Sequence, residues 1–170
     1  IGKAFLYREE YESALASFNR AADLLPSDND IKKLISNCLR LLGRYRESVE
    51  IMLGLLEVIA VDAVALIELA GDLKMLERFE EALDVYRRAS SVACDSIEPL
   101  SGIYDCQMRL GNREKAMTTL KRAIMIEPYN QQLLIKLADL YLGDGKIQEA
   151  VDVVCKGLET VQEPRLLQDK

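Results

Sequence analysis

The sequence contains no histidine and no tryptophan, and only 6% of its residues are aromatic. Without histidine the chain can form neither a Ser–His–Asp triad nor a Cys–His pair, the common ways to activate a nucleophile. Its four cysteines, at positions 38, 94, 106 and 155, lack the paired spacing of a zinc site. We therefore expect no catalytic residues, no metal, no cofactor and no enzymatic activity. Scattered cysteines of this kind are typical of a reducing compartment.

Long apolar runs and basic blocks are also missing. The most apolar stretch, residues 51–69, is interrupted by Glu57, Asp62 and Glu68, so we expect no membrane span. The net charge is −6, with 22 Lys and Arg against 28 Asp and Glu. Acidic proteins without a basic patch are not attracted to nucleic acid or anionic membranes over long range, and we expect neither as a partner.

What the sequence does contain is a set of residue columns that recur at a constant step of about 34 positions, without insertion or deletion. One column is small: Ala14, Ser48, Ala82, Ala116 and Ala150. Another is large and apolar: Phe18, Met52, Tyr86, Leu120 and Val154. In three units the second half begins with an aromatic residue (Tyr11, Tyr45, Phe79). Glycines mark the turns in the middle of three units (Gly43, Gly111, Gly145), and prolines end two units (Pro26, Pro128).

These columns resemble the tetratricopeptide repeat (TPR), a helix–turn–helix unit of this length with fixed small, aromatic and proline positions. The resemblance implies an all-α fold, a right-handed α-solenoid of antiparallel helix pairs. We expect one array over residues 1–170. It comprises a partial repeat (1–28), four full repeats (29–62, 63–96, 97–130, 131–164) and the start of a further helix (165–170).

Some residues depart from their columns. Lys32 stands where the other units have leucine, Gln107 occupies an apolar position, and Arg113 and Ile147 replace the aromatic that opens the second helix. The simpler interpretation is repeat drift tolerated by neighbouring side chains. The alternative is that Lys32 or Gln107 is directed toward a partner.

In proteins that resemble this one, the first helix of each pair lines a concave groove that binds peptides. The residues left on those helices, once the packing columns are removed, are the predicted site residues. They are Lys33, Asn37, Arg40, Glu68, Met75, Asp105, Arg109, Lys136 and Asp139. They mix both signs of charge with apolar positions, which suits an extended segment or an amphipathic helix.

One subtype of the family holds the carboxyl terminus of chaperones with Lys and Asn on successive first helices. Lys33 and Asn37 match its first pair, but Glu68 stands where the second Asn belongs, and Glu98 with Gly102 replaces the final Lys and Arg. Carboxylates repel a carboxylate ligand, so the sequence argues against this subtype.

The leading functional hypothesis is a non-catalytic scaffold that binds a peptide or helix of a protein partner within a multiprotein assembly. An alternative is a substrate-recruiting arm of a larger enzyme, such as a glycosyltransferase or a ubiquitin ligase subunit. We expect an intracellular, cytoplasmic location, with the nucleus left open. The chain opens and closes within first helices, so we expect an excerpt of a longer array that self-associates through its exposed ends.

Overall fold

The computed structural model describes residues 1–162, without the side chains of Lys156 and residues 158–162. Ten α-helices and no strand occupy these described residues. The helices are α1 (Gly2–Tyr7), α2 (Tyr11–Leu24), α3 (Asn29–Leu41), α4 (Tyr45–Gly54), α5 (Ala63–Met75), α6 (Phe79–Val92), α7 (Ile97–Arg109), α8 (Arg113–Ile126), α9 (Gln131–Gly143) and α10 (Ile147–Gln162). The helix predicted to begin at 165–170 lies outside the described residues.

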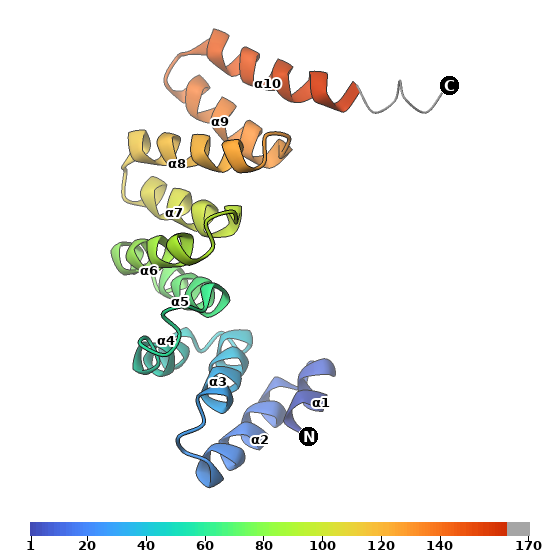
Figure 1. The fold of residues 1–170 in the computed structure, drawn as a ribbon, viewed down its shortest axis with the longest axis vertical. Coiled ribbons are helices and arrows are strands. Elements are labelled where there is room, and N and C mark those ends of the chain that lie inside the picture. Colours follow the sequence, from blue (N-terminus) through green and yellow to red (C-terminus); the bar gives the residue numbers. More distant parts are fainter. Residues whose placement is uncertain (163–170) are drawn as a thin grey trace, which may run out of the picture. The chain divides into compact units, whose positions relative to one another are not determined.

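The chain divides into two compact units, residues 1–94 and 95–170. The first contains α1 to α6 and the second contains α7 to α10. Within each unit, consecutive helices pack against each other as antiparallel neighbours joined by short turns (Figure 1). The predicted all-α, solenoid-type stacking of helix pairs is confirmed. That all 170 residues form one array stays a prediction.

The turns inside the helix pairs need a left-handed backbone residue. Gly43, Gly111 and Gly145 each have φ of +72°, which costs glycine little because it has no Cβ. The other two turns place Glu9 and Glu77 in the same conformation, with φ of +58° and +59°. The backbone geometry is therefore kept even where the sequence does not supply glycine, at an energetic cost that packing must offset.

First helices begin with a polar cap. The side chains of Asp28, Asp62, Ser96 and Asn130 each accept a hydrogen bond from backbone N–H groups in the first turn of α3, α5, α7 and α9. Such a cap satisfies donors that have no partner within the helix and stabilises it by about 1 kcal/mol. The caps set where each first helix starts.

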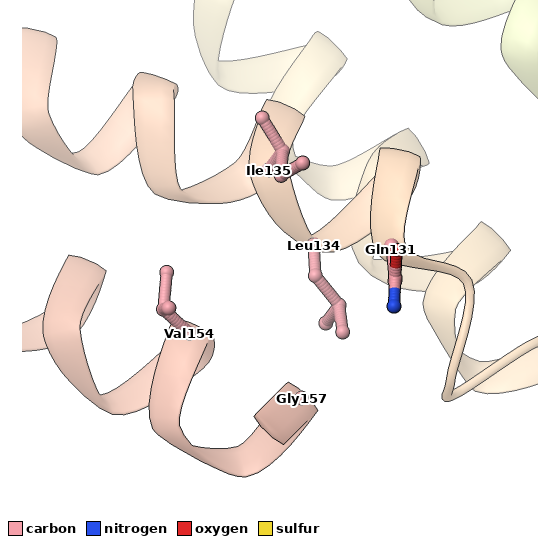
Figure 2. A pocket seen from close by; sticks show the side chains of 5 residues that line it. All are labelled: Gln131, Leu134, Ile135, Val154 and Gly157. Carbon is pink, nitrogen blue, oxygen red and sulfur yellow. The ribbon is translucent and has the colours of Figure 1, made fainter. Parts of the chain in front are cut away.

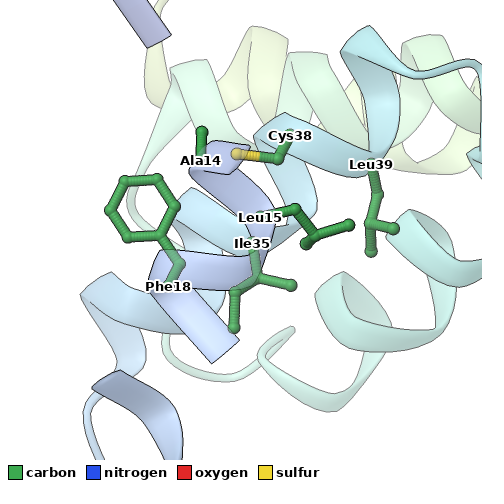
Figure 3. Packing of buried hydrophobic residues seen from close by; sticks show 6 residues of the cluster. All are labelled: Ala14, Leu15, Phe18, Ile35, Cys38 and Leu39. Carbon is green, nitrogen blue, oxygen red and sulfur yellow. The ribbon is translucent and has the colours of Figure 1, made fainter. Parts of the chain in front are cut away.

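The cores consist of the repeat columns. Ala14, Ala82 and Ala116 are fully buried, as are Met52 and Leu120 of the large column. Figure 3 shows how the cluster of the first helix pairs packs residues of α2 (Ala14, Leu15, Phe18) with residues of α3 (Ile35, Cys38, Leu39). Cys38 and Cys106 are buried packing residues, and burial raises the pKa of the Cys38 thiol. Cys94 and Cys155 are exposed.

Two of the column departures have a structural explanation in the second unit. Gln107 is buried and its Oε1 accepts a hydrogen bond of 2.8 Å from the Thr119 hydroxyl, so it is not directed toward a partner. Arg113 donates to the Asp144 carboxylate (2.6 Å) and to the Leu140 carbonyl (2.5 Å). The guanidinium thereby caps the C-terminal end of α9. Lys32 is half-buried, and its suggested contact with a partner stays a prediction.

Helix α4 is shorter than the sequence repeat leads one to expect. It ends at Gly54 after 10 residues, whereas α2, α6 and α8 each have 14. The matched positions in those helices are Arg20, Arg88 and Arg122. Glycine in a helix costs more backbone entropy than any other residue, and from Leu55 onward the chain continues in tight turns with bonds three residues apart.

A buried polar cluster joins three helices of the first unit. The Ser48 hydroxyl of α4 donates to the Asp72 carboxylate of α5, and its oxygen lies 2.8 Å from the Ser36 hydroxyl oxygen of α3. Asp72 is 2% exposed, and this burial raises its pKa to about 6. The Ser48 hydrogen bond and the charge of Arg40 lower the pKa, whereas the charge of Glu68 raises it further. Asp72 thus places a carboxyl group in a repeat column whose neighbouring members, Cys38 and Cys106, are buried cysteines.

Gly54→Ala is expected to stabilise the protein by about 0.5–1 kcal/mol, because alanine favours the helix and its Cβ would meet no atom within 4 Å. Urea unfolding followed by circular dichroism measures the change. Gly143→Ala is the matched control. Its Cβ would collide with the guanidinium of Arg113, so that variant should lose stability. An equal response of both variants would show that glycine does not set the end of α4.

Asp72→Asn is expected to change how stability depends on pH. Because the folded-state pKa of Asp72 lies above its unfolded value of 3.8, the contribution of Asp72 to the free energy of unfolding falls as pH rises from about 4 to about 6. The variant keeps an acceptor for Ser48 but has no charge to bury. Its stability relative to wild type should therefore increase across this window by up to about 3 kcal/mol. Parallel stability curves from pH 4 to 7.5 would contradict the assignment, and the exposed Asp95→Asn should follow wild type.

Candidate functional site

Two ion pairs join the first helices α3 and α5 of the first unit. The Lys33 ammonium lies 3.0 Å from the Asp62 carboxylate and 3.9 Å from that of Asp30. Asp62 is also the cap of α5, and the pKa of its carboxyl group is lowered, first by the backbone N–H of Ala65 and then by Lys33. Lys33 is therefore held between the starting points of two successive first helices.

The second ion pair joins Arg40 to Glu68, and Arg40 also contacts Asn37; all three are predicted site residues. One guanidinium nitrogen of Arg40 donates to the Asn37 side-chain oxygen (2.7 Å) and to the Glu68 carboxylate (2.9 Å). All three side chains are half-buried. The structure thus brings together Asn37, Arg40 and Glu68. The buried Asp72 is close enough for the charge of Arg40 to lower the pKa of its carboxyl group and for the charge of Glu68 to raise it.

This geometry orients the Asn37 amide. Its oxygen is occupied by Arg40, so its NH₂ group points its two donors away from the guanidinium. We define the first-helix face of unit 1 as Lys33, Asn37, Arg40, Glu68 and Met75. Met75 is exposed at the end of α5. The face therefore combines a preoriented amide, paired charges and one exposed apolar side chain.

The first helices of the second unit carry a similar arrangement. The Lys136 ammonium of α9 lies 3.7 Å from the Asp105 carboxylate of α7 and 4.9 Å from the centre of the Tyr104 ring. A cation over an aromatic face is attracted by the ring electrons. Burial raises the pKa of the Tyr104 hydroxyl, and the charges of Asp105 and Asp139 raise it further.

The remaining predicted residues, Arg109 and Asp139, belong to the second unit. Arg109 is exposed in the last turn of α7, and Asp139 is exposed on α9. The sequence reasoning did not assign site roles to Asp62, Asp72 or Tyr104. A signal for Asp72 was present, because it stands in the column of Cys38 and Cys106 while its partner Ser48 interrupts a column of alanines. Two polar departures in columns that meet in space indicate a buried polar contact.

An apolar hollow of about 230 Å³ lies between α9 and α10. Figure 2 shows its lining side chains, which are those of Gln131, Leu134, Ile135 and Val154, together with Gly157. Val154 is 42% exposed, whereas Leu120, one repeat earlier, is 1% exposed. Among the described residues the large apolar column is therefore open to solvent at Val154.

Two absences concern the part of the chain that the structure describes. Among these residues there is no group of three His, Cys, Asp or Glu side chains placed to hold a metal ion. None of the helices described is long and apolar enough to cross a membrane.

Comparison with known families identifies the repeat. Models described as tetratricopeptide repeat match residues 1–60 and 105–130, together just over half of the chain. A comparison with curated protein sequences finds no match.

Solved structures with the same fold include a crystal structure of MamA, with a TM-score of 0.87 and 18% identity, covering 97% of this chain and 96% of that one. TTC0263, a thermophilic TPR protein of Thermus thermophilus, has a TM-score of 0.63 and 25% identity, covering 98% and 90%. YrrB, described as a TPR protein with an unusual peptide-binding site, has a TM-score of 0.77 and 18% identity, covering 98% and 85%. With its repeat columns, its helix pairs and both family matches in agreement, the chain belongs to the tetratricopeptide-repeat family.

Proposed function

We propose that this protein is a non-catalytic interaction scaffold that binds a peptide or helix of a protein partner on its first helices, within a multiprotein assembly. The observation that carries the proposal is the Asn37 amide, whose oxygen is held by Arg40 so that its NH₂ donors are available. An amide fixed in this way can donate to a main-chain carbonyl of any extended segment. The peptide-binding site named for YrrB lends support by analogy of fold.

The charges of this face select the kind of partner. Lys33 is paired with Asp62, and Arg40 is paired with Glu68, so neither basic residue needs a partner carboxylate. Replacing one of these ion pairs by a pair with the partner gains little free energy, because each exposed pair contributes only about 0–1 kcal/mol. We therefore propose a segment that binds through its backbone and through apolar side chains near Met75. In the second unit, Asp105, Arg109, Lys136 and Asp139 form the corresponding surface.

Asn37→Ala is expected to weaken peptide binding about tenfold, which corresponds to about 1.4 kcal/mol for the loss of a main-chain hydrogen bond. Peptides selected from a displayed random library on the wild-type protein provide the ligands, and fluorescence anisotropy gives the Kd. Asn19→Ala, the same change on the exposed side of α2, is the matched control. If all selected peptides bind the Asn37 variant as tightly as wild type, the site lies elsewhere.

The hollow between α9 and α10 favours a second role. We propose that its exposed apolar position, marked by Val154, supports self-association of the protein. Leu120, at the matched position of α8, is buried, and burying Val154 against a second copy gains free energy in the same way.

Val154→Glu is expected to lower the apparent mass of the protein in sedimentation equilibrium at high concentration, since a charge in the hollow opposes its burial. Ile147→Glu, also exposed on α10 but outside the hollows that Val154 lines, tests whether the effect is local. A wild-type protein that stays monomeric at every concentration would contradict self-association.

A further inference from the structure

Exposed apolar side chains gather where one helix pair of the first unit is joined to the next. Leu24, Val58 and Val92 hold the same place at the ends of three successive second helices, or in the turn that follows, and they are 82%, 51% and 40% exposed. Leu25, Val61 and Val64 add further exposed apolar surface beside the first two of these positions. This surface adjoins the first-helix face discussed above at Lys33, which pairs with Asp30 and Asp62.

The early end of α4 produces the largest part of this surface. After Gly54 the chain runs in turns to Asp62, and Leu55 and Ile59 are buried while Val58 and Val61 face solvent. Val64 follows in the first turn of α5 and is also exposed. Three valines within seven residues thus remain uncovered, although valine is among the residues most often buried.

The first turn of α3 lies close to this segment. Lys33 of α3 lies between the carboxylates of Asp30 and Asp62, which belong to the first turn of α3 and the cap of α5. The start of α3 therefore lies near the start of α5, and the segments that lead into these two helices can be followed in Figure 1. We define the inter-repeat edge of unit 1 as residues 23–30 and 57–64, which contain the apolar side chains Leu24, Leu25, Val58, Val61 and Val64.

The edge is acidic as well as apolar. Its two segments contain Asp23, Asp28, Asp30, Glu57 and Asp62, and neither segment contains a lysine or an arginine. The nearest basic residues on α3 are Lys32 and Lys33, and Lys33 is already held by two of these carboxylates. The two segments that carry the exposed leucines and valines therefore have an excess of negative charge.

We propose that the inter-repeat edge of unit 1 docks a basic amphipathic helix of a partner protein. The apolar side of such a helix would cover Leu24, Val58, Val61 and Val64, and its lysines or arginines would meet the surrounding carboxylates. A helix fits better than an extended strand, because the described residues offer no sheet edge and a helix satisfies its own backbone hydrogen bonds. Negative charge around the apolar surface disfavours an anionic membrane or nucleic acid.

The test uses a labelled peptide of about 18 residues, with leucine and lysine spaced so that they form an amphipathic helix. Fluorescence anisotropy at about 0.1 M salt measures its Kd for the full chain. A peptide with glutamate in place of lysine tests the sign of the charge. The wild-type protein should bind the lysine peptide, and the glutamate peptide should bind at least about tenfold more weakly.

Variants locate the site. Val61→Ser with Val64→Ser, and separately Glu57→Lys, should each raise the Kd by about tenfold; all three side chains are exposed, so the fold is retained. Glu80→Lys makes the same charge change at the opposite end of the helix pair, on α6. Met125→Ser with Tyr129→Ser removes exposed apolar side chains from the equivalent turn of unit 2, where Glu127 is the carboxylate. Both controls, and Asn37→Ala, should leave the Kd within about twofold of wild type.

Three results would overturn the proposal. They are no binding of the lysine peptide, equal binding of the glutamate peptide, and a loss with Glu80→Lys as large as that with Glu57→Lys. The last result would show that the net charge of the protein, rather than this edge, attracts the peptide. Because Asn37→Ala reports on the first-helix face alone, failure of one proposal leaves the other to be judged by its own data.

Discussion

The close approach of neighbouring helices is the constraint on which this structure depends. It is possible because Ala14, Ala82 and Ala116 are small and fully buried at the joints between helices. Helix axes about 8–10 Å apart leave roughly one methyl group of space at such a position. A second helix held this close to its neighbours brings the large column, including Met52 and Leu120, into the core. Stability then arises from contacts between adjacent helices, as in repeat proteins generally.

The same closeness explains why polar residues enter the core in partnered sets. Where Ser48 interrupts the alanine column, its hydroxyl finds the Asp72 carboxylate and lies beside Ser36. Where Gln107 interrupts an apolar column, Thr119 on the facing helix bonds to it. A buried polar atom without a partner costs about 1–3 kcal/mol, and no buried side-chain N or O among the described residues lacks one. Both sets lie inside one helix pair or between adjacent pairs.

The two surfaces of unit 1 differ in how their charges are used. On the first-helix face Lys33 and Arg40 are paired with Asp62 and Glu68, which fixes side chains in position and leaves little net charge. At the inter-repeat edge carboxylates outnumber basic residues and surround uncovered valines and leucines. The face is therefore suited to preorganised hydrogen bonding, and the edge to burial of apolar area with electrostatic steering.

The sequence by itself determined the repeat length, the helix pairs and the small and large core positions, because packing at a fixed step forces the same residue type to recur. It predicted that first-helix residues such as Asn37 and Lys136 face a binding partner, since they are the positions that remain on these helices once the core positions are assigned. Only the tertiary structure decided how these side chains pair, because Arg40 meets Glu68 and Lys33 meets Asp62 across different repeats. It also decided that α4 ends at Gly54 and that Asp72 is buried. Those outcomes depend on distances between helices, which a column of residues in one chain does not contain.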